Sequence, residues 1–175
     1  HSSIDELANN VVAEAHGVNN IMEISHVLKP INPPEVWAAG VTYKRSEQER
    51  RLESETPDVY SKVYASDRPE LFFKGTARTV VGHGEEIGIR QDSSWNVHEP
   101  ELAFVVSKGR IVGYTIGNDV SSHSIEGENP LYLPQAKFYD NSCAIGPCIL
   151  SSEVITDPHN LWITLSVTRD GGTVF

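Results

Sequence analysis

Two apolar runs joined by a short polar turn constrain the fold of this chain more than any other feature. The first run follows Glu99 and Glu101, the second ends at Asp119, and residues 107–110 form the turn between them. Side chains i and i+2 of a β-strand point to the same side, so the two glutamates are expected to present their carboxylates to one point. A hairpin or close crossover brings Asp119 back to that point. Oxygen ligands converging at the end of a sheet are typical of a hard-cation site suited to Mg²⁺, and the alternative of a solvated acidic edge stays open.

Composition limits the class of protein and its partners. The chain has 175 residues, 39% hydrophobic and 22% charged, which fits one globular domain with room for a small appendage. Its formal net charge of −10, without a basic cluster, argues against a nucleic-acid partner or an anionic membrane. No transmembrane run or signal peptide is visible, and Cys143 and Cys148 fit two small buried thiols, so we expect a cytoplasmic protein.

Local patterns divide the chain into an N-terminal segment and a main domain. Residues 3–6 have the spacing of a capping box and predict a short helix that ends near Gly17. The proline-rich residues 29–34 cannot continue a helix and form a linker. We therefore expect residues 1–35 to precede a domain of residues 36–175.

The main domain is predicted to have a β-rich α+β fold. A charged stretch predicts a helix over residues 45–54, and strands are expected where apolar residues cluster between turns. Beside the two runs described above, these strands are residues 36–41, 71–73, 86–89, 143–150 and 161–167. A Gly171-Gly172 turn begins a last hairpin whose return strand is incomplete, which predicts a fragment of a longer protein.

Four polar segments, in order along the chain, carry a resemblance to a known family. They are residues 41–49, residues 69–74, the acidic set described above and residues 135–147. Together they resemble the fumarylacetoacetate hydrolase family over residues 36–175, the front half of that family's catalytic core. The resemblance implies a mixed β-roll or sandwich with short helices, dimeric through this core.

The resemblance also implies a divalent-metal site. The family's E-x-E pair and later aspartate match Glu99, Glu101 and Asp119, which implies bound Mg²⁺, with Mn²⁺ and Ca²⁺ as alternatives. The family's lysine matches Lys137, near the metal and the substrate's oxyanion. A divalent ion can chelate the carboxylate and keto oxygens of a 2-oxo acid and stabilise the enolate formed when the neighbouring carbon loses a proton.

Two departures from the hydrolases of this family point to one branch. Hydrolases carry a His that pairs with a Glu three residues on to activate water, whereas here Ser46 replaces the His and Glu49 holds the partner position. Glu70 precedes a strongly apolar strand. A carboxylate packed against such an apolar surface has a raised pKa, which suits it to proton transfer. Together with residues 119–135, these two departures make the sequence similar to the sugar-acid dehydratase branch of the family.

The function implied by this branch is a metal-dependent dehydratase, a lyase, of a 2-keto-3-deoxy sugar acid such as 2-keto-3-deoxyarabinonate. Glu70 is expected to be the general base, with Lys137, Ser46 and Glu49 as further catalytic residues. Substrate-binding side chains are expected at Arg45, Ser46, Lys74, Gln135 and Lys137.

Two classes of alternative stay open. One is a hydrolase, decarboxylase or isomerase of a 2-oxo acid, with Ser46 and Glu49 positioning a water. The other is a non-catalytic metal-binding module or an inactive fragment. His98 and His123 are expected as surface residues, with a hydrogen bond to a metal ligand favoured over direct metal binding.

Overall fold

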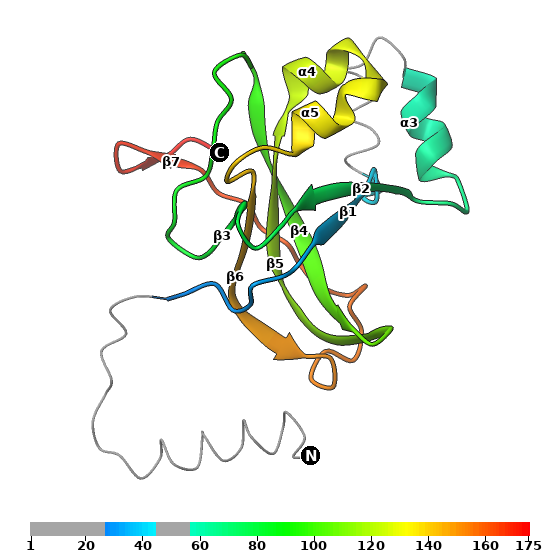
Figure 1. Ribbon diagram of the computed structural model, residues 1–175, viewed down its shortest axis with the longest axis vertical. Helices are drawn as coiled ribbons and strands as arrows, with labels where there is room; N and C mark the ends of the chain where they lie inside the picture. The colour runs from blue at the N-terminus through cyan, green and yellow to red at the C-terminus, as the bar shows by residue number, and fades with distance from the viewer. Residues whose placement is uncertain (1–26, 45–56) are drawn as a thin grey trace.

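A four-stranded sheet forms the centre of the computed structural model, which describes residues 27–44 and 57–175 (Figure 1). Its strand order is β3-β6-β5-β4. The strands are β3 (Val80–Val81), β4 (Asn96–Ser107), β5 (Arg110–Ser122) and β6 (Cys143–Ser151). β3 pairs with β6 in parallel, and the other neighbours are antiparallel.

The β4–β5 pair is the hairpin that the two apolar runs predict. Its turn places Lys108 and Gly109 at φ values of 51° and 72°, the left-handed region that a two-residue hairpin turn requires. The register sets Glu99 opposite Asp119 and Glu101 opposite Gly117. Directly opposed residues of an antiparallel pair share a face, so the predicted convergence of these carboxylates on one face is confirmed.

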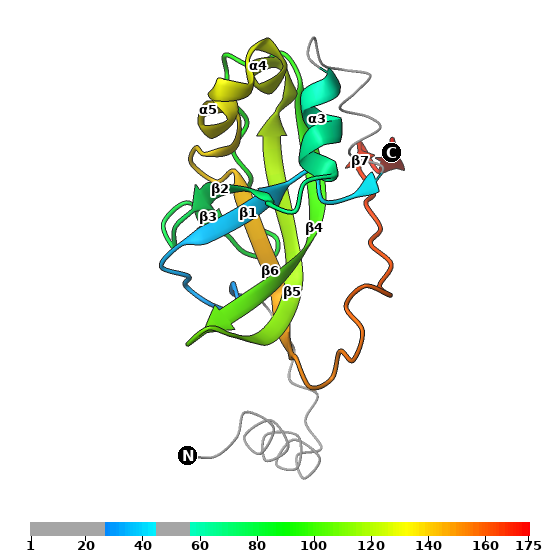
Figure 2. The same ribbon diagram turned by 90° about the vertical axis from the view of Figure 1, so that its right-hand side faces the viewer.

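A two-stranded antiparallel sheet of β1 (Val36–Gly40) and β2 (Glu70–Gly75) lies across the central sheet (Figures 1 and 2). Both strands confirm their predictions. In β2 the burial alternates: Phe72 and Lys74 are buried, whereas Leu71 is 62% exposed. The even-numbered side chains of β2 therefore face the central sheet.

Short helices follow β5 and lie at one end of the long hairpin (Figure 2). They are α4 (His123–Glu128), the 3₁₀ helix η1 (Pro130–Tyr132) and α5 (Leu133–Lys137), while α3 (Pro57–Tyr64) precedes β2. Ser122, the last residue of β5, caps α4 because its side chain accepts a hydrogen bond from the Ile125 N–H. This cap makes the chain turn sharply, so that α5 returns beside the end of β5.

Two predicted strands are not formed. Residues 86–89 run without a ladder, although the Gly88 N–H donates to the Asn141 carbonyl at 2.9 Å. Residues 163–167 alternate in polarity, yet residues 161–166 join no sheet in the described part of the chain, and Trp162 is 98% exposed. Val167 exchanges backbone hydrogen bonds with Val174 and Phe175. Alternating polarity gives a segment the potential to form a strand, but only a partner supplies the ladder.

The last hairpin is present, made of β7 (Thr168–Arg169) and β8 (Gly172–Thr173). Its turn residues are Asp170 and Gly171, both with positive φ, rather than the glycine pair. The helices predicted over residues 3–17 and 45–54 lie outside the described residues.

The buried core cluster consists of Val80, Cys143 and Ile145, with Ile31 and Val36 packed against it. Both cysteines are free, and Cys148 is exposed, so the expectation of two buried thiols is wrong for Cys148. Cys148 lies where the pairing of β6 with β5 is irregular, next to the exposed Pro147 and past the buried Cys143 and Ile145. Within the described ranges, no helix has the length and apolar character needed to cross a bilayer.

Candidate metal and catalytic site

Lys137 lies at the centre of an acidic cluster on the hairpin. Its ammonium Nζ is 2.5 Å from Glu99 Oε2, 3.1 Å from Asp119 Oδ2 and 2.6 Å from Ser121 Oγ. The side chain is 4% exposed and belongs to the last residue of α5. The fold thus brings a lysine from the helical end of the molecule between carboxylates of β4 and β5.

Glu101 lies on the same face of β4 as Glu99. Burial, together with the negative charges of Glu99 and Asp119, raises the pKa of its carboxyl to about 7, against a hydrogen bond with Tyr43 that lowers it. The Tyr43 hydroxyl also accepts from the Leu102 N–H at 3.3 Å. A carboxyl with this pKa exchanges its proton near neutrality, so it readily becomes a charged ligand when a cation binds.

Glu70 begins β2 and faces the same cluster. Burial raises the pKa of its carboxyl, as does the negative charge of Glu126, while the Lys137 ammonium lowers it. Gly40, opposite Glu70 in β1, leaves room for this carboxyl, because a Cβ there would lie 2.6 Å from Glu70 Oε2. A half-buried carboxyl with a raised pKa, next to an ammonium, can both accept and return a proton.

Lys74 lies beneath the cluster rather than in an open substrate site. It is 1% exposed, and its Nζ is 2.6 Å from Asp119 Oδ1. Burial lowers the pKa of its ammonium, and the charge of Asp119 opposes that effect. This placement differs from the expected contact with substrate.

Two residues of α4 lie at the site. The sequence reasoning missed Glu126, whereas for His123 it weighed a hydrogen bond to a metal ligand beside a surface position. His123 Nε2 lies 3.1 Å from Glu99 Oε1, and its ring packs edge-on against Trp95 at a centroid distance of 4.8 Å. Glu126 is 6% exposed, with Oε2 4.0 Å from Lys137 Nζ. The spacing i, i+3 puts both on one face of a helix, which was the available signal. His123 is therefore not the surface residue we expected.

Of the remaining predicted site residues, the structure describes only Gln135. Arg45, Ser46 and Glu49 lie outside the described residues. Gln135 is exposed on α5, and its backbone carbonyl accepts from Arg90 Nη1 at 3.2 Å.

The cluster fits a divalent cation. Glu99 and Asp119 already hold one cationic group, the Lys137 ammonium, and oxygen donors of this kind suit Mg²⁺. A second set of donors shares Glu99: its carboxylate, a nitrogen of His123 and a carboxylate oxygen of Glu126 lie within 4.8 Å of one another. That mixed nitrogen and oxygen set is more typical of zinc, so the carboxylates of β4 and β5 are the better match for Mg²⁺.

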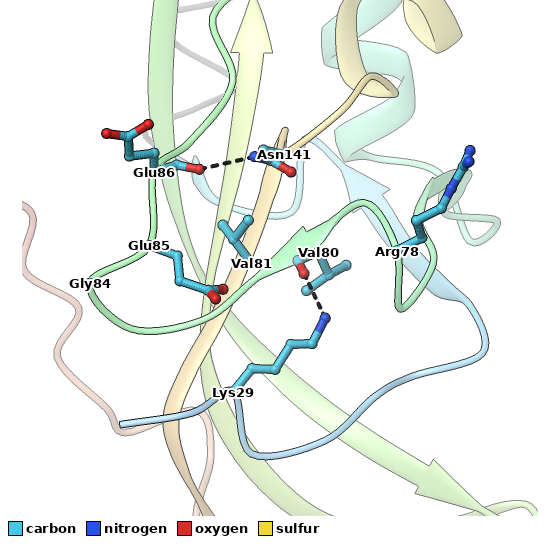
Figure 3. Close-up of a pocket in the computed structure, with 8 residues that line it drawn as sticks. All are labelled: Lys29, Arg78, Val80, Val81, Gly84, Glu85, Glu86 and Asn141. Carbon is cyan, nitrogen blue, oxygen red and sulfur yellow. Dashed lines mark hydrogen bonds between the residues drawn. The ribbon is translucent and has the colours of Figure 1, made fainter. Parts of the chain in front are cut away.

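A separate hollow of about 510 Å³ lies beside β3 (Figure 3). Its lining includes Lys29, Arg78, Glu85 and Asn141. None of the residues that line it belongs to the acidic cluster. Its charges are mixed in sign, and they select no class of ligand.

A β-hairpin that presents carboxylates to a buried lysine, with short helices at one end, makes this a β-rich protein with a candidate cation site on its central sheet. Residues 35–174 match the model of the fumarylacetoacetate (FAA) hydrolase C-terminal family. The chain belongs to this family.

Similar proteins are dehydratases of 2-keto-3-deoxy sugar acids. The chain is 52% identical over 174 residues to a probable 2-keto-3-deoxyxylonate dehydratase of Haloferax volcanii, covering 99% of this chain and 60% of that protein. It is 49% identical over 155 residues to the 2-dehydro-3-deoxy-D-arabinonate dehydratase of Saccharolobus solfataricus, covering 85% of this chain and 52% of that protein. The chain therefore spans only part of the length of these relatives.

A solved structure extends the similarity to the fold. It is a 2-keto-3-deoxy-D-arabinonate dehydratase complexed with magnesium and 2,5-dioxopentanoate, with a TM-score of 0.76 and 44% identity. The match covers 95% of this chain and 56% of that one.

Proposed function

We propose that the full-length protein is a divalent-metal-dependent dehydratase, a hydro-lyase, of a 2-keto-3-deoxy sugar acid with five carbons. The observation that carries the proposal is the position of Lys137 between Glu99 and Asp119, with the half-buried Glu70 facing the same cluster. The names of the relatives described above support the choice of substrate.

In this proposal Glu70 takes the proton from C3 of the substrate. The electron pair of the C3–H bond moves toward the 2-oxo group, and the Lys137 ammonium stabilises the negative charge that develops there. Loss of the C4 hydroxyl, protonated by the acid form of Glu70, then releases water and leaves a C3=C4 double bond conjugated to the 2-oxo group. Transfer of a proton from C5 to C3 moves the double bond to C4=C5, and the resulting enol tautomerises to the semialdehyde. The raised pKa of Glu70 suits both steps, because the same carboxyl must first accept the proton and then return it.

Mg²⁺ is the proposed cofactor, held by Glu99, Glu101 and Asp119. When bound, it supplies a Lewis acid for the carboxylate and 2-oxo oxygens of the substrate. Arg45, Ser46 and Gln135 are proposed to bind the rest of the substrate, and Glu49 to assist proton transfer, as the family resemblance implies.

The test is turnover of 2-keto-3-deoxyarabinonate and 2-keto-3-deoxyxylonate by the full-length protein with Mg²⁺, with 2,5-dioxopentanoate detected by mass spectrometry. We expect product that disappears with a chelator, and a kcat lowered ~100-fold or more in Glu70→Gln. Glu35→Gln, an exposed acid on the approach to β1, is the matched control and should retain wild-type turnover. Turnover of other 2-oxo acids by hydrolysis, decarboxylation or isomerisation, without dehydration, would overturn the assignment.

The ligand set is tested by calorimetric titration of Mg²⁺. We expect Asp119→Asn to abolish binding, because it removes a charged ligand, and His123→Ala to weaken binding only moderately, because it orients Glu99. The reverse order of effects would assign the cation to Glu99, His123 and Glu126.

We also propose a cytoplasmic homodimer in which residues 1–35 precede the catalytic domain. The two free cysteines fit a reducing compartment. Phe104 and Ile116, 56% and 61% exposed on one face of the hairpin, supply apolar surface of the kind that a partner subunit covers. Light scattering of the full-length protein measures the oligomeric state.

A further inference from the structure

Lys74 is a fully buried lysine that the proposed reaction does not use. It is the third of the even-numbered side chains of β2, after Glu70 and Phe72, that face the central sheet. A buried ammonium is costly unless it is paired and hydrogen-bonded, so its partners indicate why this position holds a lysine.

All three N–H donors of this ammonium have acceptors within the protein. Lys74 Nζ lies 2.6 Å from Asp119 Oδ1 and donates to the Val120 carbonyl at 2.9 Å. It also donates to the backbone carbonyl of Lys137. Since an ammonium has three N–H groups, none remains to bind a substrate.

We propose that Lys74 is a positioning residue that orients both Asp119 and Lys137 for cation binding, a role that rests on the metal site of the proposed function. With Oδ1 held by Lys74, the Asp119 carboxylate directs Oδ2 to the cluster, where it lies 3.1 Å from Lys137 Nζ. Ser121 Oγ also donates to Oδ1, at 3.4 Å, but Lys74 supplies the shorter, charged contact that orients this carboxylate.

The contact with the Lys137 carbonyl acts on the second partner. Lys137 ends α5, a helix of only 5 residues, which is too short to be stable by itself. The last carbonyls of a helix have no partner within the helix, and here Lys74 Nζ and Ser142 Oγ both donate to this one. Anchoring this backbone determines where the Lys137 side chain starts and therefore whether its ammonium reaches the carboxylates.

Lys29 provides a matched control. It is a partly buried lysine that donates to the Ala77 and Val80 carbonyls at 2.5 and 2.8 Å, next to β3 and away from the acidic cluster (Figure 3). Lys29→Met and Lys74→Met both remove a lysine that bonds backbone carbonyls, but only the second removes a contact to Asp119.

The experiment is Mg²⁺ titration by calorimetry of the full-length wild type and both variants, alongside thermal unfolding. We expect Lys74→Met to weaken Mg²⁺ binding by ~10-fold or more, and Lys29→Met to bind within twofold of wild type even where its Tm falls. If Lys74→Met does not fold, Lys74→Gln, which retains two N–H donors but no charge, is measured in its place. Binding by the Lys74 variant within twofold of wild type would overturn the proposal.

A second readout separates this proposal from the proposed function. If the wild type binds no Mg²⁺, the metal-dependent function fails, and crystal structures of the variants then decide the role of Lys74. We expect the Asp119 carboxylate and the Lys137 side chain to move in the Lys74 variant and to keep their places in Lys29→Met. Unmoved side chains in the Lys74 variant would assign it a purely structural role.

Discussion

Glu101 shows how one carboxyl can be held ready for a cation. Without a bound cation, burial raises the pKa of this carboxyl from its ordinary value of 4.5 to about 7, so the folded state retains a proton that the unfolded chain releases. Stability contributed by this proton is fully present below pH 4.5 and is lost as the pH rises to about 7. Without a bound cation, Glu101 therefore stabilises the folded protein least at and above neutral pH, where its carboxylate is charged and able to bind Mg²⁺.

Glu101→Gln tests this residue directly. In the presence of a chelator at pH 8, we expect the variant to be more stable than wild type by ~1–3 kcal/mol, because a neutral amide avoids burying a charge. At pH 4 the difference should vanish. Denaturant unfolding at both pH values measures the effect, with Glu86→Gln, an exposed acid, as control. Equal stability of variant and wild type at pH 8 would argue against a raised pKa.

At the scale of elements, β5 is the strand on which the site depends, because it pairs with β4 on one side and β6 on the other. β5 and β6 lie close together at Gly113. A Cβ there would lie 2.4 Å from Ile149 Cγ2 and 2.6 Å from the Leu150 carbonyl oxygen. The Ile149 methyl belongs to a side chain, but the Leu150 carbonyl oxygen cannot retreat without moving the backbone of β6, so a side chain at Gly113 must push β5 and β6 apart.

Gly113→Ala is therefore expected to lower the free energy of unfolding by ~1–3 kcal/mol through overpacking. Gly127, in α4, is the matched control, since a Cβ there would meet nothing within 4 Å. Gly127→Ala should leave stability unchanged or raise it by up to ~1 kcal/mol, because alanine favours the helix. Urea unfolding of both variants measures the difference in their free energies of unfolding. A similar loss of stability in both would show that the close approach of β6 at Gly113 does not determine the effect of a side chain there.

At the scale of the whole molecule, the acidic cluster connects metal binding to folding. Glu99 and Asp119 lie on separate strands, and Lys137 reaches them from α5, so this set of groups exists only in the folded state. A ligand that binds only the folded state stabilises it in proportion to its concentration relative to Kd.

We expect Mg²⁺ at 100 times its Kd to stabilise the protein by ~2.7 kcal/mol at pH 8, and EDTA to reverse the gain. The gain should shrink below pH 7, where Glu101 holds its proton and must release it to bind the metal. Thermal unfolding at both pH values measures this dependence. A Tm that is independent of Mg²⁺ at pH 8 would contradict a divalent-metal site in these residues.

The sequence by itself determined the hairpin and its carboxylates. Residues 99–119 contain the alternation, the turn and the acidic positions that set Glu99 opposite Asp119, because strand periodicity and turn conformation are local properties. Glu70 was found for the same reason, as an acid at the start of an apolar strand. The strands predicted at 86–89 and 161–167 failed because pairing is not a local property.

The tertiary structure decided how side chains from distant segments meet at the site, including Lys137, whose place near the metal was implied by the family resemblance and by no local pattern. Lys137 reaches Glu99 across a sequence separation of 38, and Lys74 reaches the Lys137 carbonyl across 63. Neither contact follows from the periodicity of any segment. The placement of His123 and Glu126 likewise depends on the turn that Ser122 caps. A local pattern assigns a residue to a strand or helix and to one of its faces, whereas what that face meets depends on how distant elements pack together.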